Sequence, residues 1–363
     1  MGKKILLLLF SLFLVSCGGQ KPTPGPTVSS PEPVWSPRPV FPKTPSPTPT
    51  VSPSPTLAPP TETPVVLAEG RIIFYRPTPR GHDALWILDG QGLRRITDGT
   101  FRVSFPILSP DGQRVAFVSN LEEPQGTIYL INTDGTGLQK VVASPPGAKW
   151  PAWSPDGTRI AFAAEIGIPQ AHASQFDIFV VDLVTREVTN LTCTDGPDEV
   201  GPAWSPDGQK IAFACGMGVC VMNADGTGRK DITPLLPEGT GLYFSTPWWS
   251  PVGHWIATLL MPHGEMWLLA PDGSTFVRSG PLVSQHPKWS PDGKTVTYAL
   301  AGFVYVFDLS SSKATKLVEG ENPTWSPDGK KIAFEREGFL SILDLTDSVV
   351  IPLTEGELPQ WYP

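Results

Sequence analysis

One five-residue stretch, Trp-Ser-Pro-Asp-Gly, recurs along this chain and constrains its fold more than any other feature. Two altered copies, Leu108-Ser-Pro-Asp-Gly112 and Trp249-Ser-Pro-Val-Gly253, lack the tryptophan and the aspartate respectively. A short apolar run such as Ile160-Ala-Phe162 begins two residues after each copy. A unit that returns every few tens of residues predicts a repeat architecture. Four copies are intact, at 153–157, 204–208, 289–293 and 325–329.

Each repeat unit reads as four short strands joined by turns. In one unit the expected strands are 150–153, 159–163, 177–182 and 187–192. Runs of about five β-branched or aromatic residues between Gly, Pro and Asp turns are typical of strands. Charged residues make up only 17% of the chain, against 35 Gly, 43 Pro and 12 Trp. This composition favours an all-β protein.

The number of units follows from the motif spacing and from the two ends of the repeat region. The motif serines stand 36 to 51 residues apart, which is the size of a four-stranded β-propeller blade. Arg71–Tyr75 resembles a second strand without a first, and Pro359–Pro363 aligns with the first strand at Pro323–Pro327. These fragments sum to one blade. We therefore predict seven four-stranded blades over 68–363, closed by pairing of the C-terminal strand with the N-terminal blade, which removes open sheet edges.

The motif itself is explained by turn chemistry and packing. Proline presets φ for a tight turn, aspartate bonds to its own backbone, and glycine accepts positive φ. One tryptophan per unit at a fixed place predicts packing between blades. The loop that starts at Asn132 resembles a calcium loop, but its twelfth position is Ala143, which cannot ligate a metal. No metal site and no cofactor are predicted.

The N-terminus carries an export signal. Lys3 and Lys4 precede an apolar run, Ile5–Val15, that is short for a membrane span. The sequence Leu14-Val15-Ser16-Cys17 resembles a bacterial lipobox, which implies a signal peptide over 1–16 and a lipidated Cys17. A plain secretory signal and an uncleaved anchor are the alternatives, and all three place the rest outside the cytoplasm. The resemblance implies a lipid anchor in the cell membrane or the outer membrane.

A linker follows the signal. Residues 17–67 are mostly Pro, Thr and Ser and contain few apolar side chains to bury, so we expect a disordered, extended stalk. Some 45 residues of this kind reach roughly 140 Å at full extension. Such a reach suits a domain held away from a membrane.

The repeat also points to a family. The pattern Pro-x-Trp-Ser-Pro-Asp-Gly-x-x-Ile-Ala-Phe, followed by a strand ending in Asn/Asp-x-Asp-Gly, resembles the WD40-like PD40 repeat of TolB-type propellers. The resemblance covers nearly all of 70–363 and implies an extracytoplasmic propeller. TolB itself has six blades and an N-terminal α/β domain, so the resemblance does not extend to a role in the Tol system.

A binding site is expected on one face of the propeller. The loops between second and third strands, and the connections between blades, are long and varied, and repeat proteins place such insertions on the binding face. Residues before the inner strands should ring the channel mouth there, namely Arg102, Lys149, Glu199, Ser245, His286, Asn322 and Glu357. Nearby loops add His82, Asp83, Glu165, His172, Tyr243, His263 and Glu265. The predicted ligand-binding residues are His82, Lys149, His172, Glu199, Tyr243, His263, His286 and Asn322.

This lining suits a sugar, a peptide end or a metal. Three tryptophans outside the motif position, Trp150, Trp248 and Trp267, are the candidates for stacking on a sugar. We expect the partner to be an envelope or extracellular protein or glycan, besides the membrane. Nucleic acid is excluded as a partner because 27 basic residues face 35 acidic ones without a basic stripe.

No catalytic motif is present, so no catalytic residue and no enzyme activity are predicted. The chain has no Gly-x-Ser-x-Gly elbow and no HExxH or HxxxH pair. Oligogalacturonate lyases are similar seven-bladed propellers that use histidines at the channel mouth, and four histidines here share the variable face. A polysaccharide lyase is therefore the alternative, and a purely structural envelope protein is the third.

Three cysteines remain after Cys17. Cys215 and Cys220 flank a short hairpin, and Cys193 precedes the same unit. An exported protein favours one disulfide and one free thiol. We favour the Cys215–Cys220 bond, with Cys193 able to pair with either.

Overall fold

The computed structural model describes residues 67–79, 82–142, 145–167, 174–193, 196–234, 241–282 and 287–363. Everything before residue 67 lies outside this part, including Cys17, the predicted signal peptide and most of the stalk. Within the described ranges, no helix is long and apolar enough to cross a membrane.

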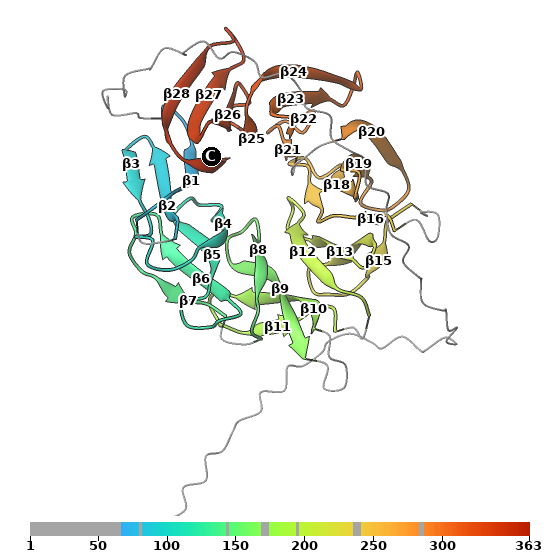
Figure 1. Ribbon diagram of the computed structural model, residues 1–363. Coiled ribbons are helices and arrows are strands. Elements are labelled where there is room, and N and C mark those ends of the chain that lie inside the picture. Colours follow the sequence, from blue (N-terminus) through green and yellow to red (C-terminus); the bar gives the residue numbers. More distant parts are fainter. Residues whose placement is uncertain are drawn as a thin grey trace, which may run out of the picture. The chain divides into compact units, whose positions relative to one another are not determined.

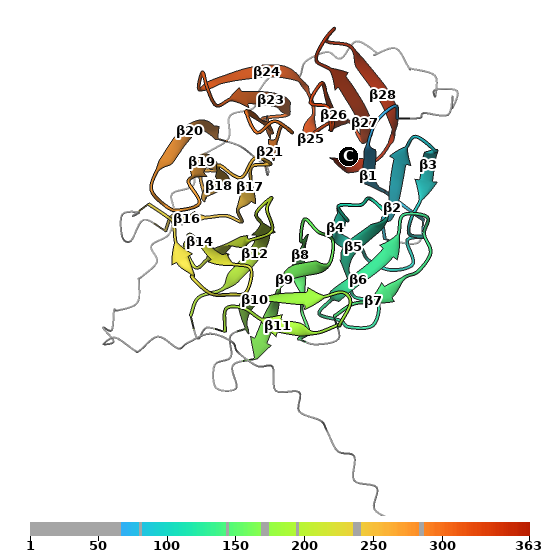
Figure 2. The ribbon, with the colours of Figure 1, turned by 180° about the vertical axis from the view of Figure 1, so that it is seen from behind.

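The described chain folds into seven four-stranded antiparallel blades arranged in a ring, as predicted (Figures 1 and 2). The inner strand of blade 5 is interrupted and counts as two short strands. The strands of each blade are given from the inner to the outer one. Blade 1 consists of β29 (Glu357–Tyr362), β1 (Arg71–Arg76), β2 (Ala84–Asp89) and β3 (Gly92–Arg95). Blade 2 consists of β4 (Ser104–Leu108), β5 (Arg114–Ser119), β6 (Thr127–Asn132) and β7 (Gln139–Lys140). Blade 3 consists of β8 (Lys149–Trp153), β9 (Arg159–Gly167), β10 (Ser174–Asp182) and β11 (Val188–Asn190). Blade 4 consists of β12 (Glu199–Trp204), β13 (Lys210–Cys215), β14 (Gly218–Asn223) and β15 (Lys230–Asp231).

The remaining three blades follow the same order. Blade 5 consists of β16 (Tyr243–Phe244) with β17 (Trp248–Trp249), then β18 (Ile256–Met261), β19 (Glu265–Leu269) and β20 (Phe276–Leu282). Blade 6 consists of β21 (Lys288–Trp289), β22 (Thr295–Leu300), β23 (Phe303–Asp308) and β24 (Lys313–Glu319). Blade 7 consists of β25 (Glu321–Trp325), β26 (Lys331–Arg336), β27 (Phe339–Asp344) and β28 (Val350–Glu355).

Blade 1 is built from both ends of the repeat region. The last strand β29 pairs with β1, with Tyr362 opposite Arg71 and Trp361 opposite Ile72. This pairing confirms the predicted closure. The propeller also reaches slightly further toward the N-terminus than the sequence indicated, because Leu67 is only 6% exposed and its N–H donates to the carbonyl of Asp89 at 3.2 Å.

The cores lie between neighbouring blades, and the Ile-Ala-Phe runs explain how. On β9, Ile160 and Phe162 face blade 2, whereas Ala161 on the opposite side faces blade 4. Blade 7 repeats the arrangement, with Ile332 and Phe334 toward blade 6. Side chains alternate across a strand, so each blade presents a bulky face to its predecessor and a small face to its successor.

The recurring motif forms a turn and an inter-blade contact, as predicted. In one copy, the Ser154 hydroxyl donates to the Asp156 carboxylate at 2.5 Å, and Gly157 N–H donates to the Ser154 carbonyl at 2.9 Å. Four motif tryptophans donate their indole N–H groups to inner-strand carbonyls of the preceding blade. Trp153, Trp204, Trp249 and Trp289 do so at 3.0–3.3 Å. Trp361 instead donates to the Glu69 carbonyl, and the buried Trp325 N–H has no acceptor among the described residues.

The ring has two faces that differ in the loops they carry. The turn face holds the first-to-second and third-to-fourth strand turns of each blade, including every motif turn. The mouth face holds the second-to-third strand loops and the connections between blades. The inner strands run from the mouth face to the turn face, so their first residues surround the mouth.

A disulfide lies at one hairpin of the mouth face. Cys215 on β13 and Cys220 on β14 are bonded, with their Cα atoms 5.8 Å apart. No cysteine of the described chain carries a free thiol, so the expectation of an odd free thiol is wrong there.

Candidate binding site at the mouth of the ring

Five inner strands, those of blades 1, 2, 3, 4 and 7, carry a β-bulge near the mouth. The residue before the strand proline has a left-handed φ of 51–52° at Phe105, Trp150, Asn322 and Leu358, and Gly201 takes the same place in blade 4. The strand register shifts at each of these positions. Such a φ is uncommon for a residue other than glycine, and a bulge re-aims the side chain it carries. Phe105 and Leu358 are accordingly 44% and 47% exposed.

Three of these bulge residues line a cavity of about 660 Å³ on the mouth side of the ring. Four blades contribute to it, namely blades 1, 2, 6 and 7. Its walls combine apolar side chains with a similar number of polar and charged ones. The lining residues are Tyr75, His82, Asp83, Arg102, Val103, Ser104, Phe105, Pro106, Lys288, Asn322, Pro323, Glu357, Leu358, Pro359 and Gln360.

Charges of both signs surround this cavity. Asp83, Arg102 and Glu357 are exposed at its rim. Burial raises the pKa of Glu357, and the nearby carboxylates of Glu335 and Asp83 raise it further. Burial also raises the pKa of the Tyr75 phenol, with a smaller contribution from Asp83. The rim therefore stabilises a positive charge near Glu357.

Glu335 on β26 holds two of the bulges in place. Its carboxylate accepts a hydrogen bond from the Asn322 side-chain amide at 2.8 Å and another from the Leu358 N–H at 3.3 Å. One carboxylate thus ties the mouth ends of β25 and β29 together. The bulge geometry is fixed before any ligand arrives.

An aromatic surface continues from the cavity onto blade 3. The Phe105 and Trp150 ring centroids are 5.8 Å apart, and those of Trp150 and Phe176 are 5.9 Å apart. The Lys149 ammonium lies 4.8 Å from the centre of the Phe176 ring. A partner larger than the cavity would meet apolar rings here, in an arrangement typical of recognition surfaces.

The structure brings some of the predicted site residues together and separates others. His82 and Asn322 line the cavity, and Lys149 lies on the aromatic surface. Tyr243 and His263 are exposed on blade 5, away from the cavity. His172 and His286 lie outside the described residues.

Glu199 does not face the mouth. It is fully buried between blades 3 and 4, where it forms an ion pair with Arg229. Its pKa is raised chiefly by burial, against the opposing effects of Thr192 and Arg229. We assign it to the inter-blade core, because no ligand can reach a side chain with no exposed surface.

The sequence did not single out Phe105, Leu358 or Lys288, although each carried a signal. An aromatic or apolar residue directly before the strand proline marks Phe105 and Leu358, as it marks Trp150. Lys288 stands between the proline and the motif tryptophan, where Ala152 and Ala203 stand in other blades. All three stand out when the residues at equivalent positions of the repeat are compared between blades.

No histidine cluster suited to a metal occurs among the described residues. The one group of potential ligand atoms found there joins Cys215, Cys220 and Asp231, and the two sulfurs are already bonded to each other. His82 and His263 stand on different blades, and His254 lies in the motif turn of blade 5 on the other face.

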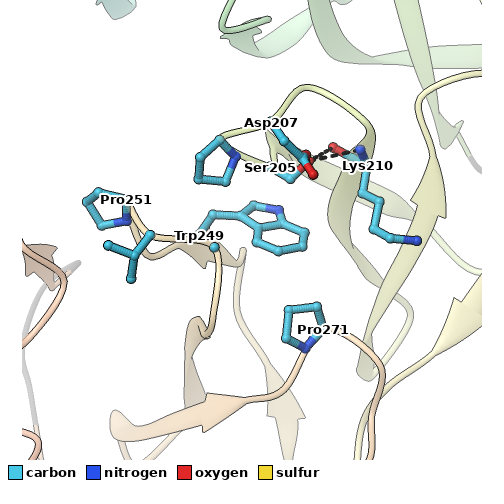
Figure 3. Close-up of a pocket in the computed structure, with 9 residues that line it drawn as sticks. Ser205, Asp207, Lys210, Trp249, Pro251 and Pro271 are labelled. Carbon is cyan, nitrogen blue, oxygen red and sulfur yellow. Dashed lines mark hydrogen bonds between the residues drawn. The ribbon is translucent and has the colours of Figure 1, made fainter.

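A second cavity, of about 290 Å³, lies on the turn face between blades 4 and 5 (Figure 3). The Trp249 indole lies between Ser205 and Pro271, and Pro206 and Pro251 also line the cavity. The Ser205–Asp207 turn beside it has counterparts in other blades. This cavity belongs to the scaffold, and Val252, which stands in place of the motif aspartate, lines it.

A family comparison agrees with this architecture. The profile described as the TolB β-propeller domain, PD40, matches residues 69–275. The chain belongs to this family. The match covers β1 to β19 of the PD40 propeller, which leaves out only β29 of blade 1 and β20 of blade 5 among the first five blades, and the motif continues through blades 6 and 7. None of the curated protein sequences matches the chain.

Solved structures resemble this PD40 propeller in fold. A puromycin-hydrolysing peptidase from Mycobacterium tuberculosis shares 15% identity with a TM-score of 0.61, over 80% of this chain and 52% of that one. An oligogalacturonate lyase from Vibrio parahaemolyticus shares 14% identity with a TM-score of 0.56, over 75% of this chain and 82% of that one. TolB from Acinetobacter baumannii shares 23% identity with a TM-score of 0.49, over 81% and 67%. This PD40 chain thus spans about half of the peptidase, and the likenesses show the fold alone.

Proposed function

We propose that this PD40 propeller is an extracytoplasmic binding module that recognises an envelope or extracellular protein or glycan at its mouth face. The cavity of about 660 Å³ carries this proposal. The side chains of the repeat differ between blades at this cavity, because Phe105, Asn322 and Leu358 occupy equivalent bulge positions with the same backbone conformation. A rigid ring that displays variable side chains around a preformed cavity is suited to recognition.

The proposed location rests on the N-terminus. The lipobox-like sequence before Cys17 supports a lipid anchor in the cell membrane or the outer membrane. The Pro/Thr/Ser-rich stalk up to residue 67 would then hold the propeller away from that membrane. Metabolic labelling of the full chain with a fatty acid tests this directly. Incorporation that is lost in Cys17→Ser supports the anchor, and unchanged export without labelling contradicts it.

Affinity capture with matched variants tests the binding role. The propeller, immobilised through its stalk, is incubated with solubilised envelope proteins and envelope polysaccharides of the source bacterium. We expect Phe105→Ala with Trp150→Ala to reduce capture of a specific partner at least tenfold. Lys210→Ala with Lys294→Ala on the turn face is the control. Capture that depends on the turn-face pair, or on neither pair, contradicts the proposal.

An enzyme at the same mouth is the second candidate. The observation that favours it is the presence of His82, Arg102 and Tyr75 around one cavity, in a fold shared with an oligogalacturonate lyase. Incubation with acidic oligosaccharides, followed by the ultraviolet absorbance of unsaturated products, separates the candidates. Turnover that is lost in His82→Ala, His172→Ala or His286→Ala would replace the binding role. A purely structural envelope role predicts neither turnover nor capture.

A further inference from the structure

Lys288 breaks the repeat at a position that otherwise serves packing. It stands on β21 between the strand proline and the motif tryptophan, and the same position in blades 2, 3 and 4 holds Ile107, Ala152 and Ala203. Ile107 and Ala152 pack in inter-blade cores. No other blade has a charged residue at this position. Lys288 lines the cavity instead.

The Lys288 ammonium has no counter-ion within the part of the chain that the structure describes. No carboxylate of the described chain forms an ion pair with it. Burial lowers its pKa, with no contribution from a neighbouring charge. Lys288 is partly buried, and a partly buried cation without a partner lowers the stability of the fold, so its presence points to an anion supplied from outside.

Lys288 lies deeper in the cavity than the acidic groups. It is equivalent in the repeat to Gln360, which stands three residues after Glu357 on its own inner strand. At the rise of a β-strand this separation is about 7–10 Å along the ring axis. The cavity therefore has the positive charge of Lys288 at its inner end and the carboxylates of Glu357 and Asp83 at its rim. A ligand that matches it is anionic at its inner end and cationic further out.

The walls between these charges favour side chains over sugar hydroxyls. Phe105, Leu358 and prolines supply apolar surface. Two of the polar side chains nearby are already engaged, since Asn322 donates to Glu335 and Gln360 accepts from the Tyr362 hydroxyl. A saccharide would leave many hydroxyls without partners there, which costs binding energy.

We infer that the cavity takes the free carboxyl terminus of a partner protein. The terminal carboxylate binds Lys288, an apolar last side chain packs between Phe105 and Leu358, and a basic residue upstream meets Glu357 and Asp83. This inference rests on the proposed binding function and names its ligand class. Capture of a chain end by a fixed cation, with pockets for the last side chains, is an established mode of peptide recognition.

Fluorescent hexapeptides test this inference. Each has a free carboxyl terminus, an apolar last residue and a lysine three residues before the end, and each is compared with its C-terminal amide by fluorescence polarisation. We expect the acids to bind the full chain at least tenfold more tightly than the amides. Lys288→Met should weaken the acids at least tenfold and abolish the difference between acid and amide. Lys288→Arg should retain most of the binding, and Lys294→Met, on the exposed turn face, should retain all of it.

The outcomes are distinguishable. Lys288→Met removes an unpaired cation, so its thermal unfolding should match or exceed that of the wild type and a folding defect cannot imitate the result. Equal binding of acids and amides, or no peptide binding, overturns the inference. Binding of oligogalacturonates that is lost in Lys288→Met overturns the peptide assignment in favour of an acidic sugar. If no peptide binds but envelope capture still depends on Phe105 and Trp150, the peptide inference is wrong and the proposed binding function stands. If envelope capture does not depend on the mouth residues, both the inference and the proposed function are wrong.

Discussion

The two faces of this propeller use one backbone plan for opposite purposes. On the turn face, the serine hydroxyl donates to the aspartate carboxylate in four intact motifs at 2.5–2.7 Å, so the same atoms meet in blade after blade. On the mouth face, the bulge is repeated but its side chain is not, and Phe105, Trp150, Asn322 and Leu358 share nearly the same φ. Where both backbone and side chain repeat, the residues serve stability, and where only the backbone repeats, they are free to serve recognition.

The tryptophans give the largest test of this difference. Trp204 is 7% exposed, donates to the Ala152 carbonyl and lies under the Arg159 guanidinium at 4.7 Å. Trp204→Ala should cost about 3–5 kcal/mol of unfolding free energy, as for other buried aromatics. Trp150→Ala, at the partly buried mouth position, should cost about 1–2 kcal/mol, because part of its surface is already in water. Urea denaturation of both variants measures this, and equal losses would erase the distinction between the faces.

The hairpin disulfide tests how far the mouth face depends on local bonds. The Cys215–Cys220 bond closes a short loop, so the double variant Cys215→Ser, Cys220→Ser should lose about 2 kcal/mol. Met217→Ala, at an exposed site of the same hairpin, is the control and should change stability by less than about 0.5 kcal/mol. Thermal unfolding reports both. An unchanged double variant would show that the blade holds this hairpin without the bond.

Lowering the pH should have opposite effects on the unfolding free energy that the carboxylates of the two faces contribute. Hydrogen bonds from the Ser154 and Ser205 hydroxyls hold the pKa values of Asp156 and Asp207 below the ordinary 3.8. The ionised carboxylates therefore stabilise the fold above pH 3.8. This stabilisation is lost as the pH falls through the lowered pKa values. The pKa of Glu357 is raised above 4.5, so its charge destabilises the fold at neutral pH and ceases to do so below 4.5. Asp156→Asn with Asp207→Asn should flatten the acid branch of the stability curve.

The matching mouth variant completes that test. Glu357→Gln should raise stability slightly at pH 7 and have no effect below about pH 4. Chemical denaturation between pH 3 and 7 follows both effects. A parallel response of the two variants would mean that the carboxylates of the two faces do not differ in environment.

The smallest effect comes from repairing the broken motif. Val252 replaces the turn aspartate in blade 5, where the Trp255 N–H to Ser250 hydroxyl bond is 3.2 Å long, against 2.9 Å for the equivalent bond in blade 4. Val252→Asp should restore a side-chain acceptor and add about 0.5–1 kcal/mol. Val252→Ala provides no acceptor and should add nothing. Destabilisation by aspartate would show that blade 5 is packed around the valine.

The sequence predicted the fold well because the repeat carries its own physical explanation. Proline, aspartate and glycine in a fixed order specify a turn, and the Ile-Ala-Phe run specifies one bulky and one small face. The unpaired strands at Arg71–Tyr75 and Pro359–Pro363 then specified closure and the number of blades. These are local rules, which need no knowledge of distant contacts.

The site was harder to predict because it depends on which side chains a bulge turns outward. Asn322 and His82 were expected at the mouth and line the cavity, but Glu199, two residues before Gly201, the blade 4 equivalent of Asn322, is buried with Arg229. A bulge re-aims the side chains of a strand, so the position relative to the bulge decides which side chains face the mouth. The bulges at Phe105 and Leu358 were not anticipated, so the apolar part of the mouth was missed.

The central claim is that partners meet the mouth face and not the turn face, and site-specific photo-crosslinking in the source bacterium tests it most directly. A photoreactive phenylalanine analogue replaces Phe105 or Leu358 on the mouth face, and Gln209 or Val252 on the turn face. We predict a discrete crosslinked species from both mouth positions and none from the turn positions. A discrete species from the turn positions alone would contradict the account.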